Sequence, residues 1–445
     1  MQNASNTASL SCFTLVMHFA SQLVLGSQFL LFLTLPQAVD AKYVFAHFMV
    51  QNSYSYTQSD WAADISAAQA IGIDGFALNT AVDSYEQTKY PDAFAAAKAA
   101  QFNLFISFDM TYAWDTEDMV NLVKTYASSS SYYKWKDKPL VSTFGGDQDP
   151  NDFWTSFKTS LANQGISVSL APALISQDPD MAAQMFSTFT AFDGFFNWWS
   201  WPADDNANLT TDTDLAYQKA IPETGKSGPY IMSVSPWQFK ELGGSEDWVE
   251  QCDTLWKYRW EQAIHDVKPD IVEIISWNDY AESHYISDIN PVVNLGSLAP
   301  LYVDGFDHAG WRKMAKYYIS WYKNGTAPAI TEDYVVYWYR AYPKDINCSQ
   351  GGLPKNSAFP QDAVFAFSML KAAANITLTV GDSTATFHAD KGVAIGSVPF
   401  SKQDGQKPKI KIMRHGQTVK SGTGSKAIST TSCAYYNFNV LVGVV

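Results

Sequence analysis

The chain has 445 residues, 47% of them hydrophobic and 17% charged, and this composition excludes an intrinsically disordered protein. The formal net charge of −14 opposes binding to a phosphate backbone, so we expect no nucleic-acid partner. The length allows one large hydrophobic core and a smaller second module.

Residues 1–41 have the features of a signal peptide that is removed on secretion. An apolar run at 29–35 is followed by Pro36 and by the small residues typical of a cleavage site. The segment is unusually long and lacks Lys and Arg, and a start at Met17 would leave a more ordinary leader. The run is too short to span a bilayer, and we expect no membrane span elsewhere. We therefore predict a secreted protein, extracellular or in the cell wall.

Short apolar runs alternate with longer amphipathic stretches between residues 42 and 345, the predicted catalytic domain. The runs predict eight strands, at 43–50, 73–79, 103–109, 139–144, 168–174, 192–199, 230–235 and 271–277. The predicted helices between and after them include 59–71, 115–127, 151–164, 178–190, 246–265 and 308–323. Eight strand–helix units favour an α/β fold of the closed (β/α)8 TIM barrel type. The alternative is an open doubly wound sheet, but no Gly-rich phosphate loop follows the first strand.

The composition changes near residue 345. Residues 42–345 hold 20 basic and 39 acidic residues, whereas 346–445 hold ten basic and four acidic ones and no Trp. Alternating runs such as 373–380 and 409–413, separated by Gly, Asp and Ser, predict a small β-sandwich accessory domain at 346–445. Whether this domain binds carbohydrate is left open.

The cysteines and glycosylation sequons agree with a secretory route. Removal of the leader removes Cys12, and Cys348 and Cys433 then bracket the C-terminal domain, so we predict that they form a disulfide. Cys252 is left as a buried thiol. N-glycosylation is predicted at Asn208, Asn324, Asn347 and Asn375.

The polar segment 275–285 follows the last predicted strand, and it carries Asp279 and Glu282 three residues apart. The two β-carbons would lie about 5–6 Å apart on a helical turn, or up to about 10 Å apart on an extended loop. Retaining glycosidases hold their carboxyl groups about 5–5.5 Å apart and inverting ones about 6.5–9.5 Å apart, so the spacing permits either. A structural pair that caps a helix or holds a loop is the alternative.

Further polar and aromatic residues follow predicted strands and are candidate substrate contacts. They are His47, Asn79, Asp109, Asn197, Trp198, Trp199, Trp237, Trp277, Asn278 and Tyr285. Trp201 extends the same tryptophan cluster, which could floor a carbohydrate cleft. Burial in the core is the alternative for each of them. Metal-binding motifs and a Gly-x-Ser-x-Gly elbow are missing, so we expect no metal, no cofactor and no esterase chemistry.

Several motifs resemble one family in the same order along the chain. The segment 276–286, SWNDYAESHYI, resembles the catalytic signature of the fungal α-1,3-glucanases (mutanases) of glycoside hydrolase family 71. The segments 44–50, 72–79, 192–199 and 436–439 also resemble that family, so the resemblance covers nearly the whole chain after residue 42. It implies a (β/α)8 barrel followed by a β-sandwich, and endo-acting cleavage of α-1,3-glucan with inversion.

The resemblance also implies roles for individual acids. Asp279 and Glu282 match the essential carboxylates, with Glu282 as general acid and Asp279 as general base. Asp74 matches a third acid, although its place at the start of a strand favours a structural role. Two other functions stay open, a non-catalytic glucan-binding wall protein and a glycosidase of another linkage preference. We expect a monomer whose partner is α-1,3-glucan.

Overall fold

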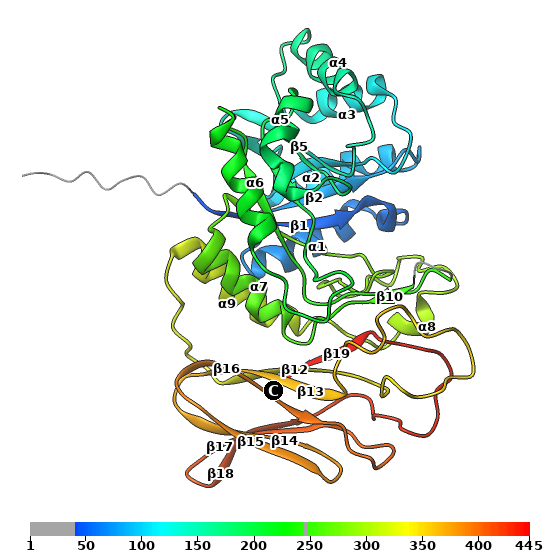
Figure 1. Ribbon diagram of the computed structural model, residues 1–445, viewed down its shortest axis with the longest axis vertical. Helices are drawn as coiled ribbons and strands as arrows, with labels where there is room; N and C mark the ends of the chain where they lie inside the picture. The colour runs from blue at the N-terminus through cyan, green and yellow to red at the C-terminus, as the bar shows by residue number, and fades with distance from the viewer. Residues whose placement is uncertain (1–40, 244–246) are drawn as a thin grey trace, which may run out of the picture. The chain divides into compact units, whose positions relative to one another are not determined.

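A curled sheet of parallel strands positions the candidate site. The computed structural model describes residues 41–243 and 247–445 (Figure 1). The parallel strands are β1 (Tyr43–Met49), β2 (Gly75–Thr80), β3 (Asn103–Asp109), β5 (Lys138–Phe144), β6 (Ser169–Ala173), β7 (Phe195–Asn197), β8 (Tyr230–Val234) and β11 (Ile271–Ile274). Each falls within or close to one of the eight predicted runs, so those predictions are confirmed.

The strand order is β6-β5-β3-β2-β1-β11-β8-β7, and every neighbouring pair is parallel. The edge strands β6 and β7 are linked where the amides of Asp193 and Gly194 donate to the Leu170 carbonyl, at 2.8 and 3.2 Å. The short strand β4 (Lys134–Trp135) pairs antiparallel with β5. The sheet therefore curls until its two edges meet, and all carboxyl ends of the parallel strands lie on one side.

Strand β1 shows how the sequence fixes the two faces of this sheet. Phe48 stacks on Trp61 of helix α1, with ring centroids 4.5 Å apart, so alternate residues of β1 face the helices. Phe45 packs on Phe105 of β3 at 4.9 Å and therefore faces the interior of the curl. His47, two residues further along the strand, shares this interior face because side chains alternate along a strand.

Helices cover the outside of the sheet (Figure 1). They are α1 (Gln58–Ala70), α2 (Tyr90–Ala100), α3 (Thr116–Tyr126), α4 (Asn151–Ala162), α5 (Ala182–Thr188), α6 (Asp212–Glu223), α7 (Leu255–Gln262) and α9 (Trp311–Asn324). The short helix α8 (Pro300–Val303) lies near β10 instead (Figure 1). Single turns are formed by η1 (Val50–Ser53), η2 (Glu86–Thr88), η3 (Pro179–Met181) and the π-helical η4 (Ala263–Val267). The predicted helix at 178–190 is divided into η3 and α5.

The helix predicted at 246–265 is wrong in its first half. Residues Trp248–Val249 form β10, which pairs antiparallel with β9 (Phe239–Lys240), and α7 begins only at Leu255. The Val249 amide also donates to the Lys355 carbonyl at 3.0 Å, so a contact with a distant segment overrides the local helical pattern.

The C-terminal region consists of two four-stranded antiparallel sheets. One has the order β16-β13-β12-β19, and the other has the order β15-β14-β17-β18. Their strands are β12 (Tyr334–Arg340), β13 (Ala363–Leu370), β14 (Ala374–Val380), β15 (Ser383–Ala389), β16 (Gly392–Pro399), β17 (Lys409–Arg414), β18 (Gln417–Thr423) and β19 (Val440–Val444). The first sheet starts at β12, before the predicted domain boundary at residue 345.

Strand β12 carries apolar and aromatic residues up to its last position, Arg340, because both of its faces are buried. Val335 and Tyr337 belong to the core shared with the second sheet, together with Ile376 and Ile410. Trp338, on the other face, packs on Trp311 of α9 with ring centroids 4.9 Å apart. The first sheet is thus packed between the second sheet and the helices.

The predicted disulfide between Cys348 and Cys433 is present, and Cys252 is a buried free thiol. All four sequon asparagines are exposed. The predicted leader lies almost entirely outside the described residues. Within the part of the chain that the structure describes, no helix combines the length and apolarity needed to cross a membrane.

Candidate active site

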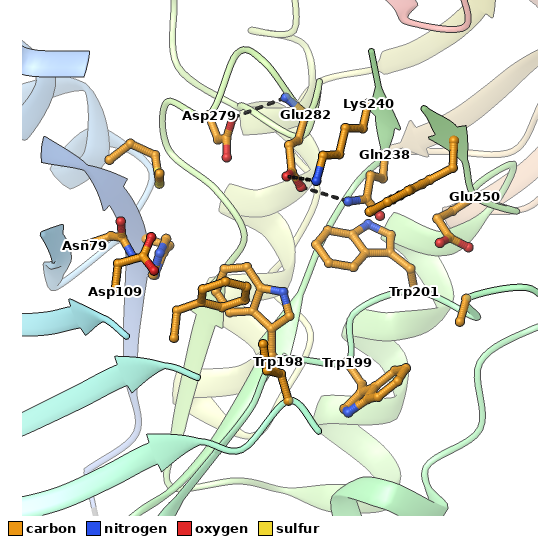
Figure 2. A pocket seen from close by; sticks show the side chains of 16 residues that line it. Asn79, Asp109, Trp198, Trp199, Trp201, Gln238, Lys240, Glu250, Asp279 and Glu282 are labelled. Carbon is orange, nitrogen blue, oxygen red and sulfur yellow. Dashed lines mark hydrogen bonds and ion pairs between the residues drawn. The ribbon is translucent and has the colours of Figure 1, made fainter. Parts of the chain in front are cut away.

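A pocket of about 450 Å³ opens at the carboxyl ends of the parallel strands (Figure 2). Met49, Asp109 and Phe144 end β1, β3 and β5, and Asn79 lies one residue before the end of β2. The lining residues are His47, Met49, Asn79, Asp109, Phe144, Ile175, Trp198, Trp199, Trp201, Ala203, Gln238, Lys240, Trp248, Glu250, Asp279 and Glu282. Asp279 and Glu282 therefore share one pocket with half of the predicted substrate contacts.

The loop after β11 brings Asp279 and Glu282 together. The Asp279 amide donates to Ser276 Oγ at 2.8 Å, and the Glu282 amide donates to Asp279 Oδ1 at 3.2 Å. His284 Nε2 lies 3.3 Å from Glu282 Oε2 and 3.8 Å from Asp279 Oδ2. A carboxylate oxygen of each acid and this imidazole nitrogen lie within 4.8 Å of one another. The turn thus places both acids around one histidine.

The surroundings of Glu282 favour its ionised form. Its carboxylate accepts a hydrogen bond from Gln238 Nε2 at 2.9 Å and lies 3.3 Å from Lys240 Nζ (Figure 2). Burial by itself raises the pKa of Glu282, but the hydrogen bond and charge of His284, the Lys240 ammonium and the Gln238 hydrogen bond together lower that pKa to about 2.

The surroundings of Asp279 favour its protonated form. Burial raises the pKa of Asp279, and the negative charge of Glu282 adds to this, while the positive charge of His284 opposes it. The pKa values of the two carboxyls are therefore shifted in opposite directions, and an unequal pair of this kind suits acid–base hydrolysis.

His284 was part of the quoted motif, but sequence reasoning gave it no role. Its Nδ1 lies 2.9 Å from Ser276 Oγ, so Ser276 orients the ring whose Nε2 faces Glu282. Asp279, Glu282 and His284 could also hold a metal ion, because their ligand atoms are mutually close. Lys240 already places a positive charge beside the Glu282 carboxylate. The predicted absence of a metal stays a prediction.

Sequence reasoning also missed the β9–β10 hairpin, which contributes Lys240 and Trp248 and is flanked by Gln238 and Glu250. Strands of two residues leave no periodic signal in the sequence.

Burial, with the negative charge of Asp204, raises the pKa of Glu250 to about 8, so this acid holds a proton at neutral pH. One of its oxygens has no hydrogen-bond partner among the described residues.

Three of the predicted substrate contacts, His47, Asn79 and Asp109, line the pocket from β1, β2 and β3 and can form hydrogen bonds. His47 Nδ1 lies 2.7 Å from Glu273 Oε1 of β11, and within the described chain His47 Nε2 has no partner. Asn79 Oδ1 is likewise buried and unpartnered in the described ranges. Asp109 Oδ1 accepts from the amide and hydroxyl of Thr111 at 3.0 and 2.6 Å. A sugar hydroxyl could satisfy the unpartnered atoms.

The loop after β7 supplies the aromatic floor. Trp198 contacts His47 and Phe144, with ring centroids 5.0 and 4.6 Å apart, and Trp201 lies 5.4 Å from the His284 ring. Trp199 is 38% exposed and also lines the pocket (Figure 2). Trp198, Trp199 and Trp201 of the predicted tryptophan cluster therefore line the pocket.

Asp74 does not line the pocket, so the structure does not support a role for it as a third catalytic acid. It precedes β2, at the end of the strand that is remote from Asn79. Its Oδ2 accepts from the Val44 amide at 2.8 Å and pairs with Lys323 Nζ at 2.6 Å. These contacts tie β1, β2 and α9 together, which is a structural role.

Trp237, Trp277 and Tyr285 do not line the pocket and are fully buried. Trp237 Nε1 donates to the Phe438 carbonyl at 3.0 Å. The Tyr285 hydroxyl donates to the Phe306 carbonyl at 2.6 Å. The prediction that these three residues contact substrate is corrected, because their large apolar rings fill the core instead.

Asn197 and Asn278 position site residues without facing the pocket. Asn278 exchanges hydrogen bonds with the backbone of Met49, at 2.7 and 3.2 Å, and so fastens the carboxylate loop to β1. Asn197 Oδ1 accepts from the Trp199 amide at 3.1 Å. Their predicted direct contact with substrate is likewise corrected.

Paired carboxylates beside an aromatic floor, at the carboxyl ends of parallel strands, define the class as glycoside hydrolase. The chain belongs to glycosyl hydrolase family 71, whose family model matches residues 40–445. The family resemblance predicted from the motifs is thereby confirmed.

Three relatives align over most of their length. The chain is 36% identical to the glucan endo-1,3-alpha-glucosidase agn1 of Schizosaccharomyces pombe, covering 91% of this chain and 94% of the relative. It is 36% identical to the mutanase Pc12g07500 of Penicillium rubens, covering 90% and 88%. It is 29% identical to the ascus wall endo-1,3-alpha-glucanase of S. pombe, covering 91% and 98%.

Proposed function

We propose that this enzyme hydrolyses α-1,3-glucosidic bonds within α-1,3-glucan. The observation that carries the proposal is the Asp279–Glu282 pair, which faces a pocket in a chain similar over nearly its full length to an endo-1,3-alpha-glucosidase and a mutanase. A neutral polysaccharide also suits a pocket floored by tryptophans.

The two acids divide the work in this mechanism. The protonated Asp279 donates its proton to the glycosidic oxygen as the C1–O bond breaks, and the ionised Glu282 takes a proton from the water that attacks C1. The pKa directions of the two carboxyls support this assignment. It reverses the roles implied by the family resemblance, in which Glu282 was the acid.

Inversion is proposed from the family resemblance. One oxygen of each carboxyl lies within 4.8 Å of the other, and inverting enzymes hold the two carboxyl groups about 6.5–9.5 Å apart. In this proposal the pair opens around substrate and water. NMR of the first product from an α-linked substrate tests this step, because inversion releases the β-anomer. Initial release of the α-anomer would contradict it and would make Glu282 a nucleophile.

The architecture is proposed as a (β/α)8 barrel followed by a β-sandwich. Eight parallel strands in the described residues, with linked edges at β6 and β7, support the barrel. Two antiparallel sheets around one core support the sandwich. Because β12 belongs to the first of these sheets, the boundary between the domains is moved from residue 345 to the segment before Tyr334.

The substrate contacts are proposed to be His47, Asn79, Asp109, Trp198 and Trp199, all of which line the pocket. Secretion to the cell wall is proposed on two grounds, the exposed sequon asparagines and the disulfide. A monomer is proposed as well, and sedimentation of the purified enzyme tests it.

Release of reducing sugar tests the function. Glu282→Gln and Asp279→Asn are each expected to lower the rate on α-1,3-glucan by about 10²–10⁴-fold. Glu223→Gln, at an exposed acid of α6, is the matched control. Unchanged activity in either site variant would contradict the assignment.

A wild-type protein that binds but does not cleave the glucan would support a wall-binding protein instead. Parallel digestion of α-1,4- and β-1,3-glucans tests the linkage preference.

A further inference from the structure

We propose that Tyr54, Tyr85 and Tyr112 form a platform beside the pocket that binds glucose units of the glucan chain beyond the cleavage site. This tyrosine platform rests on the proposed function, because a glucan chain that is bound for internal cleavage extends past the pocket. The ligand is a neutral α-1,3-linked glucan chain.

The three tyrosines come from the loops that follow β1, β2 and β3. The rings of Tyr54 and Tyr85 meet edge to face, with centroids 4.9 Å apart. The Tyr85 hydroxyl donates to the Gln51 carbonyl at 3.1 Å, and Gln51 Nε2 donates to the Tyr112 hydroxyl at 2.8 Å. Gln51 therefore joins three separate loops into one surface.

This surface is aromatic and open to solvent. Tyr54 is 62% exposed and Tyr112 is 37% exposed, whereas most large aromatic side chains of the described residues are buried. Scattered exposed apolar residues are ordinary on protein surfaces, but a hydrogen-bonded cluster marks an interaction site more often. Tyrosine suits sugars because its face packs on the C–H groups of the ring and its hydroxyl bonds to sugar hydroxyls.

The tyrosine platform is continuous with the pocket along the chain. Met49 lines the pocket and is two residues from Gln51, and Asp109 lines it and is three residues from Tyr112. The pocket volume of about 450 Å³ is in the range of sites for small ligands. A glucan chain that fills it must leave over its rim, and the loops that carry the platform begin at the ends of β1, β2 and β3, where Met49, Asn79 and Asp109 line the pocket.

Two measurements test the platform. In a Glu282→Gln background, which is designed to bind without cleaving, Tyr54→Ala with Tyr112→Ala is expected to weaken binding to insoluble α-1,3-glucan by about tenfold, the loss of two stacking contacts. In the active enzyme the same double substitution is expected to lower kcat/KM on the polymer by a similar factor. On the shortest α-1,3-linked oligosaccharide that the wild type cleaves, the change is expected to stay within about twofold.

The controls separate stacking from folding. Tyr54→Phe keeps the ring and is expected to keep polymer binding, and Val419→Ala, at an exposed residue of β18, is expected to change neither substrate. Equal losses on polymer and oligosaccharide, or no loss of polymer binding, would overturn the platform. A wild type that binds glucan without cleaving it would overturn the proposed function alone, since the binding assay would still report on the tyrosines.

Discussion

At the scale of single residues, Glu282 shows how neighbours determine chemistry. Its carboxylate contacts Gln238, Lys240 and His284, which come from two different loops. Asp279, in the same turn, contacts fewer donors, and burial raises its pKa. The pKa values of two acids three residues apart are therefore shifted in opposite directions, because the positive charges gather mainly at one of them.

Replacing Lys240 with Met tests this assignment through the pH profile. Glu282 must be ionised to act as base, and Lys240 lowers its pKa. Loss of the ammonium raises that pKa, so the acidic limb of kcat/KM is expected to move to higher pH by about one unit or more. Lys219→Met, at an exposed lysine of α6, should leave the profile in place. An acidic limb that stays at the wild-type pH in K240M would contradict the role of Glu282.

Glu250 makes a second prediction, on stability. Its folded pKa of about 8 lies above that of an unfolded glutamate, so between those two values the folded state holds a proton that the unfolded state has lost. Stability therefore falls as pH rises through this window. Glu250→Gln is expected to raise Tm relative to the wild type at pH 8 and to change it little at pH 4. Equal Tm differences at both pH values would show that Glu250 is ionised in the folded protein.

At the scale of elements, a buried ion pair joins helices α6 and α7 behind the aromatic floor. Arg259 Nη1 and Nη2 contact the two carboxylate oxygens of Asp214 at 2.6 and 2.9 Å, and both side chains are fully buried. Asn197 Nδ2 donates to the Asp214 carboxylate at 2.9 Å, and Asn197 Oδ1 accepts from the Trp199 amide. The position of the tryptophan loop therefore depends on two helices.

Removing one partner of this pair is expected to be costly. Arg259→Met leaves Asp214 buried without its countercharge, and we expect a loss of about 3–5 kcal/mol in the free energy of unfolding, measured by chemical denaturation. The exposed Lys219–Glu223 pair of α6 offers a comparison, and Lys219→Met is expected to cost less than about 1 kcal/mol. Similar losses in both variants would mean that burial adds nothing to the Arg259–Asp214 pair.

At the scale of the whole molecule, the C-terminal region braces the pocket. The Lys355 amide donates to the Asp247 carbonyl at 2.8 Å, and the Val249 amide donates to the Lys355 carbonyl at 3.0 Å, so this segment continues the β9–β10 hairpin. The Phe438 carbonyl accepts from Trp237, just before β9. The Cys348–Cys433 disulfide joins the segment that leads to Lys355 to the segment that leads to Phe438.

Breaking the disulfide tests this arrangement. Cys433→Ser opens a link across 85 residues, and we expect a loss of about 2–5 kcal/mol in unfolding free energy. Activity on glucan should fall before global unfolding, because the freed segments no longer hold the hairpin that carries Lys240. The wild type under reducing conditions is the control and should behave like the variant. A variant that matches the oxidised wild type in both stability and activity would contradict the brace.

The local pattern of residues was sufficient for the eight parallel strands and for the candidate carboxylate pair. The apolar run at 43–50 predicted β1, and the spacing of Asp279 and Glu282 predicted a candidate pair, because apolar runs and short-range spacing are properties of consecutive residues. The family motifs added the reaction class, and the family model confirmed that class.

The partners of those residues depended on the folded chain. Lys240 reaches Glu282 from a two-residue strand, Trp237 and Tyr285 turn into the core, and Asp74 lies at the far end of β2. The charge state of each carboxyl follows from groups that lie far away in sequence, and a long-range contact leaves no periodic trace along the chain. Strand order and helix packing alone determine which charges meet and which rings are buried.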